Sequence, residues 1–310
     1  MKLVFMGTPE FALPSLNALH QSGHTVLAVV CQPDRPKGRG GRLTPPPVKA
    51  MAERFELPIL QPTKMKDPIF LGDLRALEPE VIVVVAFGRI LPPAILDLPP
   101  RGCINVHASL LPKYRGAAPI QWAIINGEQE TGVTTMRLDP GMDTGDILLQ
   151  ERMPILPEDT AGSLSARLAE RGADLMIRTL KGLESGEILP VPQDHAQATL
   201  APILEKEAGK IDWTQAAVDI LNRVRGLSPW PGAYTFYQDE RWSIWKAKMG
   251  DPTAGGAPGT ILKTGREGIS VATSQGLLEI LELQPANRRR MTAGEFLAGH
   301  SVKAGVVLGG

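Results

Sequence analysis

Two stretches of the chain are almost continuously apolar, and they constrain the fold more than any other feature. Residues 81–87 read VIVVVAF and residues 103–108 read CINVHA. The first run shows no polar alternation, and the second reads as another buried strand. Such strands are typical of parallel sheets that helices cover on both faces. The two runs therefore predict an α/β domain built on a buried parallel sheet.

The chain before these two strands alternates between short apolar runs and amphipathic segments. Residues 2–6 (KLVFM) and 25–32 (TVLAVVCQ) read as further buried strands, and the segment between them carries apolar residues at helical spacing. A helix near 47–56 and a short strand at 58–61 follow. Alternating strands and helices favour a parallel sheet with helices on both faces. We therefore expect a Rossmann-like N-terminal domain.

The pattern changes near residue 190. Residues 188–204 contain several prolines and show no periodicity, which predicts a linker, and a helix is predicted at 211–227. Short strand-like segments with glycine-rich turns follow it at 233–237, 242–249, 259–264, 268–276 and 276–285. They predict a small β-barrel. The expected organisation is an α/β catalytic domain (1–189), a linker (190–205) and a small C-terminal β-barrel domain (206–310).

The composition fits a soluble globular protein, with 43% hydrophobic and 21% charged residues. The formal net charge is zero, with a small basic excess after residue 205, which is less than a strongly basic nucleic-acid binder would carry. Cys31 and Cys103 lie in apolar runs, so we expect reduced core cysteines of a cytoplasmic protein. No apolar run suits a membrane span, and the first is too short for a signal peptide.

Asn105 and His107 stand two residues apart in the apolar strand at 103–108. Side chains at that spacing share one face of a strand, and ligands of open α/β sheets bind at the carboxyl ends of the strands. An amide can donate to an oxyanion, and an imidazole can do the same or move protons near neutral pH. The pair predicts a catalytic site. The alternative is a polar pair that merely caps the end of the strand.

Residues 137–148 (RLDPGMDTGDIL) predict a glycine-rich acidic loop that contains Asp139, Asp143 and Asp146. A calcium loop would need the D-x-D-x-D-G pattern and a closing glutamate, and neither is found here. One of the carboxylates could orient His107, whereas the alternative is an ordinary polar turn. The sequence alone leaves open whether this loop meets the histidine.

A Pro/Gly-rich segment at 32–49 gathers basic side chains that only Asp34 opposes, namely Arg35, Lys37, Arg39, Arg42 and Lys49. Such a segment predicts a basic loop that grips phosphates. The alternative is a solvated surface loop. Other basic residues that could extend the same footprint are Lys206, Lys210, Arg223, Arg225 and Arg288–Arg290.

The turn after the first strand argues against a nicotinamide enzyme. It reads GTPEFA from Gly7 and lacks the G-x-G-x-x-G spacing that places a pyrophosphate on a helix N-terminus. A nicotinamide-dependent oxidoreductase therefore remains only as the alternative from another enzyme class.

Several motifs together resemble the 10-formyltetrahydrofolate-dependent formyltransferases. The run INVHASLLPKYRGAAPIQWAI followed by DPGMDTGDIL resembles the catalytic segments of that family. Further segments are similar to its bacterial members that act on transfer RNA: FMGTPEFA, QPDRPKGRG, VVVAFGRILP, IDW, SPWPGAY and APGTIL. The resemblance spans essentially the whole chain. Position 114, often tryptophan in these enzymes, is Tyr114 here.

The resemblance implies a Rossmann-like catalytic domain and a C-terminal barrel similar to an OB fold. It implies transfer of the formyl group of 10-formyltetrahydrofolate to the α-amino group of methionyl-initiator tRNA. The family's catalytic roles then fall on Asn105, His107 and Asp143. No cysteine is placed as a nucleophile, so we expect direct transfer, with no metal ion and no formyl-enzyme.

The resemblance also implies the two binding sites. Folate contacts are expected from Phe87, Ile90, Leu91, Ser109, Leu110, Leu111, Pro112 and Asp139. Contacts with tRNA are expected from Arg35, Lys37, Arg39, Arg42 and Lys206, with Arg39 as the most important. We expect a monomer whose partners are folate and initiator methionyl-tRNA, without a membrane association.

Related activities are the main alternatives within the family. An enzyme that formylates glycinamide ribonucleotide would leave residues 206–310 without a purpose, and one that formylates an amino-sugar nucleotide would not need the basic loop. Hydrolysis of formyl-folate is a third alternative. Outside enzyme classes, the chain could be a tRNA-binding module with an inactive formyltransferase domain, although intact Asn105, His107 and Asp143 argue against such decay.

Overall fold

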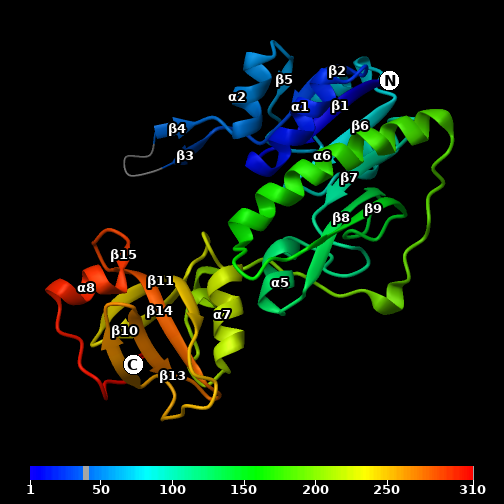
Figure 1. The fold of residues 1–310 in the computed structure, drawn as a ribbon. Helices are drawn as coiled ribbons and strands as arrows, with labels where there is room; N and C mark the ends of the chain where they lie inside the picture. The colour runs from blue at the N-terminus through cyan, green and yellow to red at the C-terminus, as the bar shows by residue number, and fades with distance from the viewer. Residues whose placement is uncertain (38–41, 310) are drawn as a thin grey trace. The chain divides into compact units, whose positions relative to one another are not determined.

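The computed structural model describes residues 1–37 and 42–309, which form two compact units (Figure 1). The first unit comprises Met1–Pro119, Glu130–Pro154 and Ser165–Ala201. The second comprises the chain from Pro202 onward together with Ile120–Gln129 and Ile155–Leu164. Two short stretches that precede residue 165 therefore pack with the last third of the chain.

The first unit is built on one seven-stranded sheet in the order β5-β2-β1-β6-β7-β8-β9. Its strands are β1 (Lys2–Gly7), β2 (Thr25–Val30), β5 (Ile59–Leu60), β6 (Val81–Val85), β7 (Cys103–His107), β8 (Glu130–Arg137) and β9 (Ile147–Pro154). The first five in that order run parallel, whereas β8 and β9 add an antiparallel edge. The predicted Rossmann-like parallel sheet is confirmed.

The antiparallel pair β8 and β9 was not predicted from the sequence. The reason lies in β8, whose buried positions include Thr131, Thr134 and Thr135. Buried strands are predicted from apolar runs, and threonine side chains at the buried positions interrupt such a run. Here they hydrogen-bond inside the unit instead, as in the 2.7 Å contact between the hydroxyl groups of Thr135 and Thr179.

Helices cover both faces of this sheet. The helices of the unit are α1 (Leu13–Gln21), α2 (Pro47–Arg54), α3 (Pro68–Ala76), α4 (Pro93–Leu96) and most of α6 (Ala161–Ser185), with the 3-10 turns η1 (Glu10–Ala12) and η2 (His195–Gln197). Side chains of α1, α2 and α6 share one hydrophobic cluster with the sheet. Side chains of α3 and α4 share the cluster on its other face. The unit is therefore a three-layer α/β structure.

A separate two-stranded ribbon precedes α2. It consists of β3 (Arg35–Lys37) and β4 (Arg42–Thr44), which pair antiparallel with Arg35 opposite Thr44. The ribbon contains the two described ends of the basic loop predicted from the sequence.

The second unit contains an antiparallel sheet in the order β10-β11-β14-β13-β12, with β15 paired to β14. Its strands are β10 (Ala233–Tyr237), β11 (Glu240–Met249), β12 (Ile261–Gly265), β13 (Gly268–Ala272), β14 (Leu277–Pro285) and β15 (Met291–Thr292). Its helices are α5 (Pro119–Ile125), α7 (Ala217–Gly226) and α8 (Ala293–Gly299), with the 3-10 turn η3 (Lys206–Gly209). The small C-terminal β domain predicted from the sequence is confirmed as an antiparallel sheet with helices packed on it.

Tryptophan forms the centre of this second core. Trp242 is fully buried and stacks on Tyr237, with ring centroids 4.6 Å apart, and meets Phe296 of α8 edge-on. Trp213 is buried as well, and its indole N–H donates to Thr235 at 2.9 Å. Both tryptophans therefore act as core residues.

The helix predicted at 211–227 is wrong in its first six residues. The helix α7 begins only at Ala217. Before it, the Asp212 carboxylate accepts hydrogen bonds from the backbone and the hydroxyl of Thr214, which forms a turn in place of helix. Aspartate side chains compete with the helical backbone in this way.

Within the described part of the chain, no helix has the length and apolar content that crossing a membrane requires.

Candidate active site

Asn105 and His107 lie on the same face of β7, as the strand period predicted. The intervening Val106, like Ile104, packs in the cluster under α1, α2 and α6. Cys103 belongs to the cluster on the opposite face of the sheet. The amide and the imidazole therefore extend the row that begins with Cys103, beyond the end of that apolar cluster.

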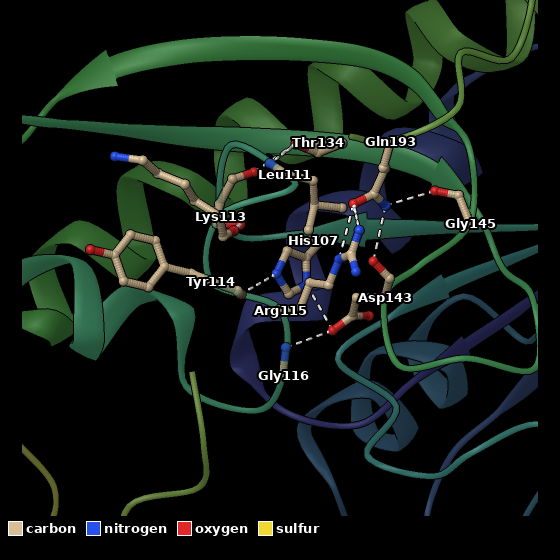
Figure 2. A network of polar contacts seen from close by, with 11 residues as sticks. His107, Leu111, Lys113, Tyr114, Arg115, Gly116, Thr134, Asp143, Gly145 and Gln193 are labelled. Carbon is tan, nitrogen blue, oxygen red and sulfur yellow. Dashed lines mark hydrogen bonds and ion pairs between the residues drawn. The ribbon is translucent and has the colours of Figure 1, made fainter. Parts of the chain in front are cut away.

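Both nitrogens of the His107 ring face oxygen atoms (Figure 2). Nε2 lies 2.9 Å from the backbone carbonyl oxygen of Tyr114, and Nδ1 lies 3.7 Å from Oδ2 of Asp143. A carbonyl oxygen only accepts, so Nε2 carries hydrogen and donates to Tyr114. The ring is 6% exposed. One end of the imidazole is thus fixed by the backbone, and Nδ1 is left for the chemistry.

Asp143 is brought to His107 by the loop between β8 and β9. Its Oδ2 accepts a hydrogen bond of 2.8 Å from the backbone N–H of Gly116, and its own φ is +54°. This left-handed conformation is uncommon for a residue other than glycine. The structure therefore provides the contact that the sequence left open, with the carboxylate held between Gly116 and the imidazole.

Gly116 can occupy its position only because it has no side chain. A Cβ atom there would lie 2.7 Å from the carbonyl oxygen of Ala201, and φ is +121°. The close approach lets the N–H of Gly116 point at Asp143.

The Asn105 side chain is half-buried. Its amide group forms no hydrogen bond with any of residues 1–37 and 42–309. A polar group at the end of a buried strand with no protein partner is available to a ligand. This observation favours the catalytic reading of Asn105 over the strand-capping one.

The residues predicted to contact folate fall into two groups. Phe87, Leu91, Ser109 and Leu111 are buried. Leu110, Pro112 and Asp139 are half-buried, and Ile90 is 87% exposed. The Asp139 carboxylate also accepts hydrogen bonds from Gly141 and Thr144, which shape the start of the Asp143 loop.

The buried residues Ser109 and Leu111 take part in hydrogen bonds that hold the 109–113 segment in place. The Ser109 hydroxyl donates to the Lys113 carbonyl at 2.6 Å, while the Thr134 hydroxyl donates to the Ser109 carbonyl at 2.6 Å. The amide of Gln150 donates to the Leu111 carbonyl at 2.8 Å. The 109–113 segment is therefore tied to β8 and β9.

A cavity of about 450 Å³ lies at the carboxyl ends of three neighbouring strands. Thr8 follows β1, Gln32 follows β2 and Ala86 follows β6, and all three line it together with residues of the basic loop, including Arg35. Because Val85 pairs with Val106, the Ala86 wall of the cavity lies one strand away from His107. This is the edge at which α/β sheets bind ligands.

The base of the basic loop is fixed by a second polar network. Lys49 Nζ lies 2.9 Å from both carboxylate oxygens of Asp34, and the Gln61 amide donates to the same carboxylate at 2.8 Å. The hydrogen bonds from Gln61 and then Lys49 hold the pKa of Asp34 below its usual range. The bond with Asp34 raises the pKa of Lys49. The positive charge of Lys49 is therefore balanced by the Asp34 carboxylate, and this ion pair anchors the loop.

Gln32 connects the same base to the loop after β6. Its Oε1 accepts a 2.6 Å hydrogen bond from Arg35, and its Nε2 donates to the carbonyl of Phe87 at 3.0 Å. Arg35, an exposed residue of β3, is thereby linked to the segment predicted to contact folate.

The remaining residues predicted to contact tRNA are placed as follows. Lys37 ends β3 and Arg42 begins β4, and Arg39 lies outside the described residues. Lys206 is exposed in η3 of the second unit. The predicted role of Arg39 therefore rests on the sequence.

Two buried residues of the site were missed by the sequence analysis, Arg115 and Gln193, each 6% exposed. Arg115 donates to Gln193 Oε1 from Nε at 3.1 Å and from Nη2 at 2.7 Å. Arg115 was noted only within the run INVHASLLPKYRGAAPIQWAI, and Gln193 lies in the proline-containing segment predicted to be a linker. Nothing in their local sequence marks them as buried.

Searching residues 1–37 and 42–309 reveals no cluster of three or more His, Cys, Asp or Glu side chains that could hold a metal ion. Burial raises the pKa of the Cys31 thiol to about 11 and that of Cys103 to about 12. Both cysteines are therefore neutral, unreactive core residues near neutral pH.

Comparisons with known proteins agree over the full length of the chain. Residues 1–180 match the family model described as formyl transferase, and residues 203–301 match the model described as formyl transferase, C-terminal domain. A methionyl-tRNA formyltransferase of Citrifermentans bemidjiense is 52% identical over 309 residues, covering 100% of this chain and 96% of that protein. One of Moorella thermoacetica is 54% identical, covering 100% of this chain and 99% of that protein.

Among solved structures, the chain is similar to an N-formyltransferase from Helicobacter canadensis in complex with folinic acid and dTDP-3-aminofucose. The TM-score is 0.69 at 18% identity, and the match covers 94% of this chain and 100% of that one. At this identity the likeness shows a shared fold.

Proposed function

The chain belongs to the formyl transferase family, as its sequence motifs predicted, and on that premise we propose that it formylates methionyl-initiator tRNA with 10-formyltetrahydrofolate. The observation that carries the proposal is the full-length similarity to methionyl-tRNA formyltransferases, which covers the basic loop and the C-terminal unit as well as the catalytic segments. The transfer is to the α-amino group of the methionine.

The loops around His107 suit a folate. Ile90 is 87% exposed on the loop after β6, and Met142 is 58% exposed in the loop that carries Asp143. Apolar side chains exposed beside a polar catalytic group are what a flat aromatic ring would cover. When bound, 10-formyltetrahydrofolate supplies the formyl group that the reaction transfers. We propose that Ile90 and the half-buried Leu110, Pro112 and Asp139 line its site.

Asn105 is proposed to stabilise the charge that develops on the formyl oxygen. Its amide has no partner among the described residues, so it can donate to that oxygen without first breaking a protein hydrogen bond. Donors already in place before the reaction lower the barrier most effectively, and one such donor is typically worth about 2.7–4 kcal/mol. The position of Asn105 on a central strand restricts its movement.

His107 is proposed to act through Nδ1, because Nε2 already donates to Tyr114. When Nδ1 also carries hydrogen, the ring is an imidazolium that the Asp143 carboxylate 3.7 Å away would stabilise. The imidazolium can donate to the formyl oxygen or return a proton to the leaving nitrogen. General acid–base help of this kind contributes roughly 10²–10⁴-fold.

Asp143 has one carboxylate oxygen that can receive a proton from the attacking amine. Oδ2 is used by Gly116 and faces His107, whereas no described residue donates to Oδ1. We propose that Oδ1 accepts a hydrogen bond from the amine and that the proton then passes within the Asp143–His107 pair.

The acceptor end of the tRNA is proposed to enter the cavity beside Ala86, next to the basic loop. The contacts proposed for the phosphates are those of Arg35, Lys37, Arg39, Arg42 and Lys206. In this proposal residues 1–189 are the catalytic domain, 190–205 connect it to the rest, and 206–310 bind tRNA as an OB-like domain. We further propose a monomeric enzyme that works in the cytoplasm.

The test is formyl transfer from 10-formyltetrahydrofolate with competing acceptors: methionyl-initiator tRNA, methionyl-elongator tRNA, free methionine and an amino-sugar nucleotide. We expect strong preference for the initiator tRNA, measured as labelled formyl in each product. Formylation of the sugar nucleotide alone, or loss of formyl to water with all acceptors unmodified, would overturn the substrate while keeping the catalytic residues.

A further inference from the structure

Gln193 lies in an irregular segment that follows α6 and is bound to the active-site loops. Val191 and Ile147 exchange two backbone hydrogen bonds of 2.8 Å, and Thr199 and Ala201 bond to the backbone of Arg115. Between these anchors the Gln193 side chain is 6% exposed. The segment therefore forms one wall of the site.

The Gln193 amide uses both of its ends (Figure 2). Nε2 donates to the carbonyl oxygens of Asp143 at 2.9 Å and Gly145 at 2.7 Å, while Oε1 accepts from Arg115 at 2.7 Å. A guanidinium only donates and a carbonyl only accepts, so these partners fix which end of the amide is oxygen. The amide can adopt no other orientation here without losing all of these bonds.

The carbonyl that Gln193 holds belongs to the residue that carries the catalytic carboxylate. Asp143 has φ of +54°, a conformation that surrounding contacts must maintain in a residue with a side chain. Its Oδ2 also accepts from Gly116, which follows Arg115 in the chain. Asp143 is therefore held at its main chain by Gln193 and at its side chain by the neighbour of Arg115.

We propose that Gln193 is a positioning residue, which holds the main chain of Asp143 so that its carboxylate faces Nδ1 of His107. This inference rests on the proposed function for the roles of Asp143 and His107. It makes the segment after α6 a functional part of the catalytic site. Gln193 touches neither substrate and acts through Asp143.

The buried charge of Arg115 strengthens this arrangement. Besides Gln193, the only contact of its guanidinium within the described chain is His195 Nδ1 at 3.1 Å, and no carboxylate lies within ion-pair distance of it there. Arg115 therefore polarises the amide of Gln193 toward stronger donation to Asp143 and Gly145.

The substitution Gln193→Glu separates a positioning role from a merely structural one. Glutamate keeps the size and gives Arg115 a stronger acceptor, but it removes the donor to the Asp143 and Gly145 carbonyls. We expect kcat to fall by about 10–100-fold because small displacements of catalytic groups are costly. The KM values for folate and tRNA should change by less than about 3-fold. The Tm should fall, because the carbonyls of Asp143 and Gly145 lose their donor. If glutamate is not tolerated, Gln193→Met keeps the length without the amide.

Gln197→Glu is the matched control. Gln197 lies in the same segment, is exposed, and its amide donates only to Asp194, at 2.7 Å. Its kcat should remain that of the wild type. A second control repeats Gln193→Glu in an Asp143→Asn background, where we expect less than about 2-fold further loss of kcat because the two residues act as one unit.

The ring signals of His107 in histidine-labelled protein give a readout that needs no substrate. The chain has five histidines, so His107→Gln serves to assign the signal. Gln193→Glu should shift it and Gln197→Glu should not. Wild-type kcat with an unmoved signal, or full additivity with Asp143→Asn, would overturn the proposal. If no acceptor is formylated, the function fails but the signal still decides the role of Gln193.

Discussion

The loop that carries Asp143 and the loop that carries Arg35 leave the same sheet, yet they are stabilised in opposite ways. Asp143 is held by hydrogen bonds that join it to the backbone N–H of Gly116 and to the buried side chain of Gln193. The basic loop is held at its base by the partly exposed ion pair of Asp34 and Lys49. The first arrangement fixes a carboxylate in one place, and the second leaves the exposed Arg35 with a hydrogen bond to Gln32.

The difference follows from what each loop is proposed to do. Catalytic groups act within a few tenths of an ångström and need a rigid support. Phosphate binding depends on charge, which acts over several ångströms and tolerates small displacements. In this protein, hydrogen bonds with the backbone therefore mark the proposed catalytic residues, whereas surface charge marks the proposed recognition residues.

The largest effect should come from Asn105→Asp, which tests the rigid side of the comparison. The substitution keeps the size but puts negative charge beside the formyl oxygen in place of a donor. We expect kcat to fall at least about 10²–10³-fold, with folate affinity mostly retained. Steady-state kinetics and folate binding by fluorescence would measure this. Near-normal turnover would remove Asn105 from the mechanism.

An intermediate effect is expected from Arg39→Ala on the basic loop. Loss of one phosphate contact should raise the KM for tRNA several-fold and reduce the salt dependence of binding by about one unit of slope. The kcat and the folate affinity should stay near those of the wild type. Filter binding across a salt series provides the measurement.

The matched control for that loop is Arg75→Ala, because Arg75 is an exposed arginine on α3, outside the basic loop. It should leave the salt slope unchanged. Equal effects of both substitutions would mean that general charge, and not the basic loop, attracts the tRNA.

The smallest effect should come from Asp34→Asn, which tests the base of the loop. The Asp34 pKa is lowered from its ordinary value of 3.8, so its contribution to stability is present above that pH and is lost as the pH falls through the folded-state pKa. The Lys49 pKa is raised from 10.5, so its contribution is lost as the pH rises beyond that value. Between these limits the substitution should lower Tm by no more than about 3 °C, because exposed ion pairs are weak.

Thermal unfolding of wild type and Asp34→Asn at pH 7 and near pH 3 would check the sign. The difference in Tm should shrink at the lower pH. A difference that grows on acidification would show that Asp34 stabilises the loop in some way other than as an ionised carboxylate.

The sequence was sufficient for the parts of the site that follow one strand. The two-residue spacing of Asn105 and His107 placed both on one face of β7, and the apolar runs predicted the sheet beneath them. Tyrosine in place of tryptophan at position 114 does not remove the contact with His107, because Tyr114 makes that contact through its carbonyl. Local periodicity and the chemistry of the motif were enough to predict the sheet and the placement of these two side chains.

The remainder depends on contacts between distant segments. Asp143 reaches His107 through a loop with a left-handed residue, and no local pattern predicts where such a loop ends. Gln193 lies 50 residues further along the chain from Asp143, in a segment without periodicity. The strand β8 was not predicted, because its buried positions include threonines and form no apolar run. Each of these features is decided by tertiary packing.

The hydrogen bonds around Asp143 and His107 have a consequence for how such a site changes over generations. The partners of these side chains are the carbonyls of Tyr114, Asp143 and Gly145 and the N–H of Gly116. A substitution at Tyr114 leaves its carbonyl in the chain, whereas a Cβ atom at Gly145 would overlap the carbonyl oxygen of Arg137 and one at Gly116 would lie 2.7 Å from that of Ala201. The insertion or deletion of one residue displaces all of these groups. Selection on these loops should therefore act on their length and on their two glycines.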